Sequence, residues 1–257
     1  MKRTPDPSTL PLFEERDFAA YEEHRQRDPE YNPYRLRVRR KLDLYAKAAK
    51  AALKKEHGLN LASRTSLNHP YRFNLGRVRA QWAYLSRSPK DRKALVERVG
   101  DTIGQDVDTH YIQTTIVCCL DAEGLETSLR IHPLAFWDAI NLRNLCATRE
   151  GAAVFLSLLA DLPEGFVLTI DRWRREYLPG RLEHRDLENF FAYFRPGEHW
   201  WNLRRRFPRE AGIAMGPELR ERLLEGLVGL GPLYRFFVWS PSNDHCFDAE
   251  GRIRRNG

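Results

Sequence analysis

Acidic and imidazole side chains gather in the middle of the chain, where they could hold a metal ion. The segment "DVDTH" places Asp106, Asp108 and His110 at alternate positions before an expected strand, so in an extended chain they share a face. Glu126 and His132 lie in the strand expected to pair with it. Carboxylates and imidazoles bind the divalent metals that assist phosphoryl transfer. These five residues are a candidate site for a metal-dependent nuclease or another phosphoryl-transfer enzyme.

Recognised catalytic patterns do not accompany this cluster. The sequence contains no H-E-x-x-H, P-loop or G-x-S-x-G pattern. The four cysteines have no C-x-x-C spacing, which argues against a zinc site or a disulfide framework; they are Cys118, Cys119, Cys146 and Cys246. We therefore predict no bound metal or cofactor, and the sequence favours a protein that is not an enzyme.

A more coherent chemistry occupies residues 63–93, "SRTSLNHPYRFNLGRVRAQWAYLSRSPKDRK". Guanidinium groups fit phosphate oxygens, and Asn, Gln and Ser donate to phosphates and base edges. The four rings, Tyr71, Phe73, Trp82 and Tyr84, could stack on unpaired bases. The helix start expected at Ser88 is an anion site in general terms. Together these features favour contact with nucleic acid.

The charge of the chain is unevenly distributed. Residues 35–100 contain 18 Lys and Arg against four acids, a net charge of +14, whereas the whole chain carries +7. A surface of mixed sign would serve solubility better, and concentrated positive charge attracts polyanions. The candidate polyanions are nucleic acid, an anionic membrane surface and an acidic protein partner.

Residues 34–57 have the clearest helical pattern. An apolar stripe recurs at helical spacing and consists of Val38, Leu42, Tyr45, Ala49, Ala52 and Leu53. Rotating each residue by 100° places Arg40, Lys47, Lys50 and Lys54 on the opposite side. Gly58 is a natural C-cap. We expect a helix with one buried face and one basic face.

Residues 59–76 are rich in Asn, Ser, Pro and Gly and are expected to form a loop. In "RVRAQWAY", alternation favours a half-buried strand, with Arg77, Arg79 and Gln81 outward, although helical spacing also fits. The predicted nucleic-acid contacts are Arg40, Lys47, Lys50, Lys54, Arg64, Arg72, Arg77, Arg79, Gln81, Arg87 and Lys90.

The remaining pattern predicts an α+β fold. We expect a charged, partly ordered helical arm over residues 1–33 and a single domain over 34–257, with its basic helix-loop-strand segment at 34–100. Its centre is an antiparallel hairpin, in which "THYIQTTIVCCL" and "LETSLRIH" flank the turn "DAEG". Further helices are expected at 89–100, 133–146, 150–162, 184–194 and 216–229, and a strand at "GFVLTI". Most of 171–215 is expected to be loop, and "LYRFFVW" a strand or buried segment.

The primary functional expectation is a cytoplasmic, non-catalytic protein that binds DNA or RNA through its phosphate backbone, using residues 35–98. The alternative is a subunit of a larger assembly that docks on an acidic protein partner. No apolar run reaches the roughly 20 residues that span a bilayer, and the N-terminus lacks the apolar stretch of a signal peptide. The sequence therefore predicts no membrane partner.

Overall fold

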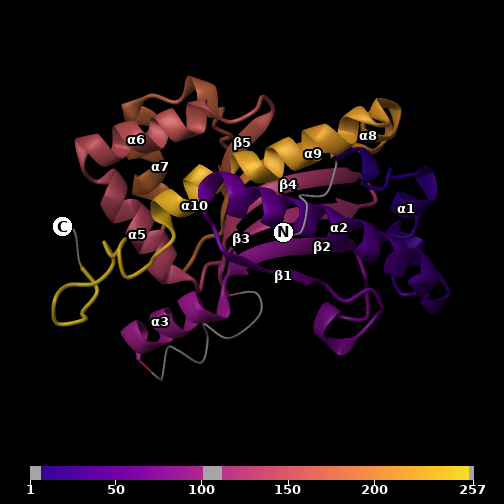
Figure 1. The fold of residues 1–257 in the computed structure, drawn as a ribbon, viewed down its shortest axis with the longest axis horizontal. Helices are drawn as coiled ribbons and strands as arrows, with labels where there is room; N and C mark the ends of the chain where they lie inside the picture. Colours follow the sequence, from indigo (N-terminus) through magenta and orange to yellow (C-terminus); the bar gives the residue numbers. More distant parts are fainter. Residues whose placement is uncertain (1–6, 101–111, 255–257) are drawn as a thin grey trace. The chain divides into compact units, whose positions relative to one another are not determined.

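The α+β class predicted from the sequence is confirmed. The computed structural model describes residues 7–100 and 112–254, where helices accompany a six-stranded antiparallel sheet of order β1-β2-β3-β4-β6-β5 (Figure 1). The strands are β1 Leu61–Thr65, β2 Ala80–Arg87, β3 Thr114–Asp121, β4 Gly124–Ile131, β5 Phe166–Ile170 and β6 Trp201–Pro208. The longer helices are α2 Asn32–His57, α3 Pro89–Val99, α5 Phe136–Cys146, α6 Arg149–Ala160, α7 His184–Tyr193 and α9 Glu218–Gly229. The shorter helices are α1 Glu15–Ala19, α8 Arg209–Met215 and α10 Gly231–Phe237.

The described residues fall into two compact units, each with its own buried side chains. The first unit draws on Met1–Leu85, Ile116–Ser128 and Arg205–Val228. The second unit draws on Ser86–Thr115, Leu129–Arg204 and Gly229–Gly257. Residues on both sides of position 34, where we expected the arm to meet the domain, belong to the first unit.

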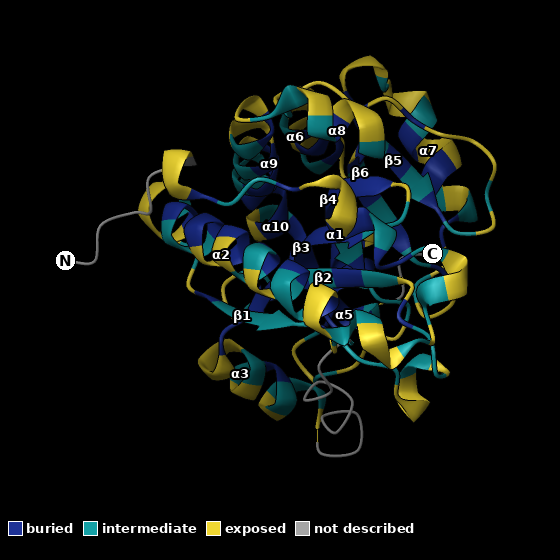
Figure 2. Ribbon diagram, turned by 90° about the vertical axis from the view of Figure 1, so that its right-hand side faces the viewer, coloured by how far each residue is buried: buried dark blue, intermediate teal, exposed yellow. Residues whose placement is uncertain are grey.

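Helix α2 and strand β1 pack together in the first unit. The whole predicted apolar stripe of α2 is buried, and Val38, Leu42 and Tyr45 are fully so. Figure 2 shows this helix with buried and exposed sides. It ends at Gly58, whose φ of 64° is left-handed and whose N–H closes the last turn. The amphipathic pattern of the sequence therefore gives the position and orientation of α2 correctly.

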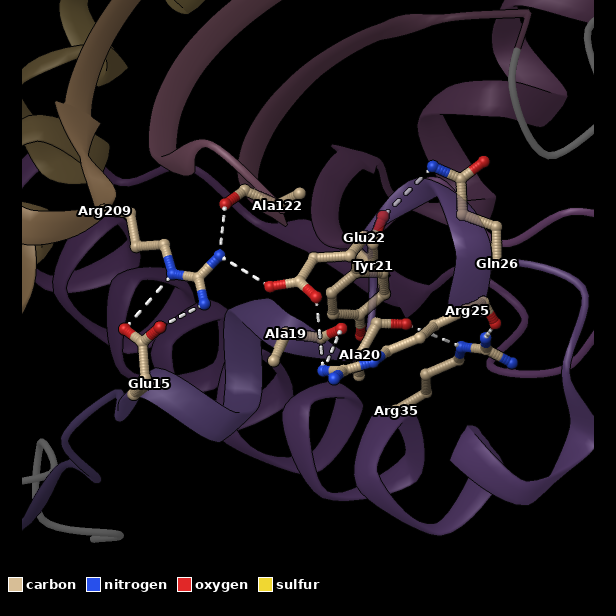
Figure 3. A network of polar contacts seen from close by, with 10 residues as sticks. All are labelled: Glu15, Ala19, Ala20, Tyr21, Glu22, Arg25, Gln26, Arg35, Ala122 and Arg209. Atoms are coloured by element: carbon tan, nitrogen blue, oxygen red, sulfur yellow. Dashed lines mark hydrogen bonds and ion pairs between the residues drawn. The ribbon is translucent and has the colours of Figure 1, made fainter.

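The N-terminal residues expected to form a partly ordered arm contribute to the core of the first unit. Phe18 and Tyr21 are fully buried. The guanidinium of Arg35, also fully buried, donates to the carbonyls of Ala20 and Arg25 (Figure 3) and to that of Asp28. A buried cation that donates to three carbonyls of this segment holds the path of the chain, and the carbonyl of Ala20 has Arg35 as its donor.

A second arginine holds the same segment from another part of the chain. Arg209 pairs with Glu15 and Glu22 and also donates to the carbonyl of Ala122 (Figure 3). These carboxylates hold the pKa of Arg209 above its ordinary value. Residues separated by almost 200 positions in sequence, Glu15 and Arg209, are thus joined by charge-assisted hydrogen bonds.

The central hairpin of the sequence prediction is confirmed as β3 and β4, which are neighbours in the sheet. Asp121 closes the turn, since its Oδ1 accepts the N–H groups of Glu123 at 2.8 Å and Gly124 at 3.0 Å. Strand β3 also pairs with β2, so that Trp82 lies opposite Cys119 and Ala83 opposite Cys118. The adjacent cysteines therefore project to opposite faces of the sheet.

One expectation for the C-terminal half is wrong, because the stretch "WNLRRRFP" is strand β6 instead of loop. The stretch "LYRFFVW" is a buried segment, one of its two expected forms, and lies mainly in helix α10. In β6 the inward position Arg205 is buried, lies 5.1 Å from the Phe207 ring and pairs with Glu225 at 3.2 Å. An arginine therefore fills an inward position of a strand, between the buried residues Leu203 and Phe207.

None of the helices in the described ranges is both long and apolar enough to cross a membrane.

Candidate nucleic-acid interface

The segment joining β1 to β2, which we call the basic loop (residues 66–79), carries exposed basic and aromatic side chains. Arg39 of α2 donates from Nη1 to Asn68 Oδ1 at 3.1 Å and so fixes the start of the loop. Near its end, the N–H of Val78 donates to the carbonyl of Gln26 at 2.9 Å, and the Val78 side chain is buried. Both ends are thus held by the body of the first unit.

Asn74 organises the tip of the basic loop. Its Oδ1 accepts the N–H of Tyr71 at 2.7 Å, and its Nδ2 donates to the carbonyl of His69 at 2.9 Å. The N–H groups of Asn74 and Gly76 both donate to the carbonyl of Tyr71 at 3.0 Å. The chain turns through left-handed conformations at Leu75 (φ 56°) and Gly76 (φ 68°). The tip is therefore a hydrogen-bonded turn with a defined conformation.

Large apolar side chains project from this turn into solvent. Tyr71 is 45% exposed, Phe73 76% and Leu75 81%. The Tyr71 and Phe73 rings lie 5.4 Å apart, and the Arg72 guanidinium lies 4.9 Å from the Phe73 centroid. The sequence identified both rings as candidates for stacking, but gave no sign that Leu75 would be the most exposed of the three.

The two other rings that we considered for stacking lie elsewhere. Tyr84 is buried against Val117 and Cys119, and Trp82 is partly buried against the same cluster. Both project from β2, whose neighbours in the sheet are β1 and β3. Of the four candidate rings, Tyr71 and Phe73 are therefore the ones placed for contact with a ligand.

Three predicted contact residues lie in the basic loop and one in the adjoining strand. Arg72 and Arg79 are exposed and Arg77 is half-buried. Arg64 is half-buried on β1, an edge strand of the sheet. The structure therefore brings Arg72, Arg77 and Arg79 into one short surface segment.

The outer side of α2 carries the other basic residues of the first unit. Arg40, Lys47 and Lys54 are exposed, and Lys50 is half-buried. Lys47 pairs with Asp43 at 2.5 Å, the helical ion pair expected from their spacing. The predicted basic face of the helix is thus present, with one of its lysines partly neutralised.

The net charge of the segment overstates the charge that is free to meet a ligand. Arg37 and Lys41 both pair with the buried carboxylate of Asp17. Arg35 donates its hydrogen bonds to main-chain carbonyls inside the protein. In contrast, no described carboxylate lies within 4 Å of any of five predicted contact residues. They are Arg40, Lys54, Arg72, Arg77 and Arg79.

Gln81 must be removed from the predicted contact set. It is fully buried, and its Nε2 donates to the carbonyl of Ser66 at 2.9 Å and to Ser66 Oγ at 2.5 Å. The alternation argument assumed that one face of β2 is exposed, whereas residues on both faces of this strand are buried. Gln81 therefore anchors the start of the basic loop from inside.

Arg87 must also be removed from the predicted contact set, because it too is buried. It is 2% exposed, and its guanidinium donates to both carboxylate oxygens of Asp138 in the second unit, to which Arg87 also belongs. Burial alone would lower the pKa of Arg87, but the adjacent Asp138 carboxylate holds it above its ordinary value. Arg87 therefore forms a buried ion pair with Asp138 and does not face solvent, where a ligand could reach it.

Lys90 lies at the exposed start of α3 in the second unit. The predicted cap is confirmed, since Ser88 Oγ accepts the N–H of Asp91 at 3.2 Å. The Asp91 carboxylate in turn accepts from Ser88 Oγ at 2.6 Å. The helix start therefore already has an acidic side chain of its own beside it.

Part of the candidate metal cluster lies outside the described residues, namely Asp106, Asp108 and His110. Glu126 is buried, and Arg206 lies 3.7 Å from its carboxylate. His132 Nδ1 accepts the N–H of Leu134 at 3.1 Å, and burial lowers the pKa of His132. In the described ranges, no three or more His, Cys, Asp or Glu residues are grouped so as to hold a metal.

The second unit contains a cleft of about 550 Å³. Charges of opposite sign in its lining pair with each other, because Arg204 lies 3.3 Å from the Glu176 carboxylate. Asp171, also in the lining, accepts the N–H of Trp200 at 2.7 Å. The cleft does not concentrate charge of one sign, so the basic loop and α2 are the stronger candidate interface.

Neither the comparison of this chain with protein-family models nor that with curated proteins returned a match.

Proposed function

We propose that this protein binds nucleic acid, mainly through the phosphate backbone, and that the contact surface is the basic loop together with the outer side of α2. The proposal rests on one observation above all. Three arginines of the loop (Arg72, Arg77 and Arg79) and two basic residues of α2 (Arg40 and Lys54) lie in one compact unit and have no described carboxylate within 4 Å.

Charge composition supports the assignment to a polyanion. Between Glu56 and Asp91 the sequence has no acidic residue, so the basic loop has no negative side chain of its own. Arginine is suited to phosphate because its planar fork can donate two parallel hydrogen bonds. Phosphate contacts of this kind give affinity with little dependence on sequence.

The spacing of the helix residues supports contact along a strand. Arg40, Lys47 and Lys54 recur every seven residues and therefore lie along one side of α2. At 1.5 Å per residue they cover about 21 Å. Arg39, the residue before the first of them, hydrogen-bonds to the basic loop through Asn68. The helix stripe thus begins beside the loop, and a backbone could follow both.

The experiment is a salt titration of binding to a fluorescently labelled oligonucleotide, measured by anisotropy. The logarithm of affinity should fall linearly with the logarithm of salt concentration, with a slope of about −0.7 to −0.9 per phosphate contacted. Replacing Arg77 and Arg79 together by Ala should weaken binding and reduce the magnitude of that slope by about 2.

The matched control removes the same charge elsewhere. Arg195 and Arg222 are exposed arginines whose ion-pair partners are Glu198 and Glu218. The double Ala variant at these two positions should retain the wild-type slope. Equal effects of both double variants, or no binding to any oligonucleotide at low salt, would refute the proposal.

A cytoplasmic location belongs to the same proposal. The support is that all four cysteines are free thiols and buried. Burial raises the pKa of Cys118 well above its ordinary value, so this thiol is protonated and unreactive. Free cysteines are typical of proteins in reducing compartments.

A further inference from the structure

We infer that the tip of the basic loop is a stacking platform for unpaired bases, so that the protein prefers single-stranded nucleic acid to a duplex. This inference rests on the proposed function, and it adds to the phosphate contacts a second kind of contact, between bases and the rings of Tyr71 and Phe73.

The exposure of the rings is the first argument. The Phe73 side chain is 76% exposed and the adjacent Tyr71 is 45% exposed. Apolar side chains in water gain nothing from the hydrophobic effect, and neither ring contributes substantially to the core. A planar base can cover such a ring, because every base presents an aromatic face.

The fixed conformation of the tip is the second argument. Asn74 hydrogen-bonds to the segment on its N-terminal side through both its Oδ1 and its Nδ2, and the carbonyl of Tyr71 accepts two main-chain N–H groups. The rings are therefore presented by a turn that is already ordered. An ordered platform loses little conformational entropy when a ligand binds.

The charge around the rings identifies the ligand. Arg72 lies over the Phe73 ring at 4.9 Å, and Arg77 and Arg79 follow within six residues. Rings interleaved with unpaired cations match a ligand that alternates planar bases with phosphates. The carboxylates of an acidic protein segment could pair with the arginines, but they would not stack on the exposed Tyr71 and Phe73 rings. A duplex stacks its own bases and offers none to the rings.

The experiment compares three ligands with the same number of phosphates: a single-stranded oligothymidine, an abasic oligonucleotide of the same length, and a mixed-sequence duplex of half that length in base pairs. The Phe73→Ala variant should bind the oligothymidine about 5- to 160-fold more weakly, the range that corresponds to 1–3 kcal/mol per stacked base. Its binding to the duplex and to the abasic strand should be unchanged. Phe73→Trp should retain single-strand affinity, and Phe73→Leu, which keeps an apolar side chain but not the ring, should not.

Leu134→Ala is the matched control, because Leu134 is 49% exposed and lies in the second unit; it should leave all three affinities unchanged. Equal losses by Phe73→Ala on every ligand, or none on the oligothymidine, would overturn the stacking platform. In either case a loss with the Arg77 and Arg79 double variant would leave the proposed function standing. If the wild-type protein bound none of the three ligands and co-purified with an acidic protein, both proposals would fall.

Discussion

The guanidinium of Arg87 donates to both carboxylate oxygens of Asp138, and neither side chain is more than 2% exposed. Asp138 also accepts from Thr114 Oγ1 at 2.5 Å and from the N–H of Trp239 at 2.9 Å. Four segments distant in sequence therefore meet at one carboxylate inside the second unit.

Breaking this pair from one side should be strongly destabilising. In Arg87→Met the Asp138 charge stays buried without its cation, so we expect the free energy of unfolding to fall by about 3–5 kcal/mol. Chemical denaturation measures the change. A double variant with Asp138→Asn removes both charges and keeps an amide oxygen as acceptor at this position, so it should recover much of the loss. A double variant as unstable as the single one would contradict this account.

Removing the cation at Arg35 should loosen the N-terminal segment of the first unit. In Arg35→Met the carbonyls of Ala20, Arg25 and Asp28 each lose a hydrogen bond to a charged group. Such bonds are worth about 1.5–3 kcal/mol each. Hydrogen exchange of the amides in residues 14–31 should speed up more than that of α9. Arg16→Met, at an exposed arginine paired with Glu14, should leave both exchange rates as they are.

Leu75 should be replaceable by glycine with a gain in stability. Its φ of 56° places a Cβ-bearing residue in the left-handed region, which costs about 1–2 kcal/mol. Glycine avoids that cost but is more flexible when unfolded, so the expected net gain is about 0.5–1 kcal/mol. Calorimetry should detect a rise in Tm of roughly 1–4 °C. A lower Tm would mean that the Leu75 side chain makes stabilising contacts.

His132 should make stability depend on pH. Burial lowers its pKa in the folded protein, so below the unfolded pKa of about 6.5 the unfolded chain binds more protons at this position. The contribution of His132 to the free energy of unfolding is then complete above that pH and is lost as the pH falls. Protonation of Nδ1 would also remove the acceptor for the Leu134 N–H. In His132→Gln, the fall in unfolding free energy between about pH 7.5 and 5.5 should be smaller than in wild type.

The elements with strong local signals were predictable from sequence. The stripe of α2 runs from Val38 to Leu53 without interruption, and the Ser88 cap and the turn at Asp121 use short-range hydrogen bonds. Strand β6 was missed because Arg204, Arg205 and Arg206 occupy consecutive positions. Its alternation is visible once Arg205 is counted as inward, a role that depends on the distant Glu225.

The sequence predicted the exposure of a contact residue correctly where that exposure follows from the local pattern of apolar and polar residues. It did not do so where the residue is buried by pairing with a residue distant in sequence. Arg40 and Lys54 are exposed because they lie opposite the apolar stripe of α2. Arg87 is basic and adjacent to a polar turn, and its burial depends on Asp138, which lies 51 positions away. No feature of the sequence near Arg87 reports that distant carboxylate.

Strand β1 has a consequence for how the protein behaves at high concentration. It is a five-residue edge strand with the sequence "LASRT". An edge strand presents main-chain groups to which the edge of another molecule could add, and short length and charge are the usual protections against such addition. Arg64 supplies that charge, between Ser63 and Thr65 at the C-terminal end of β1. Arg64 is also one of the predicted ligand contacts, so the same positive charge should disfavour edge-to-edge pairing between copies of the protein.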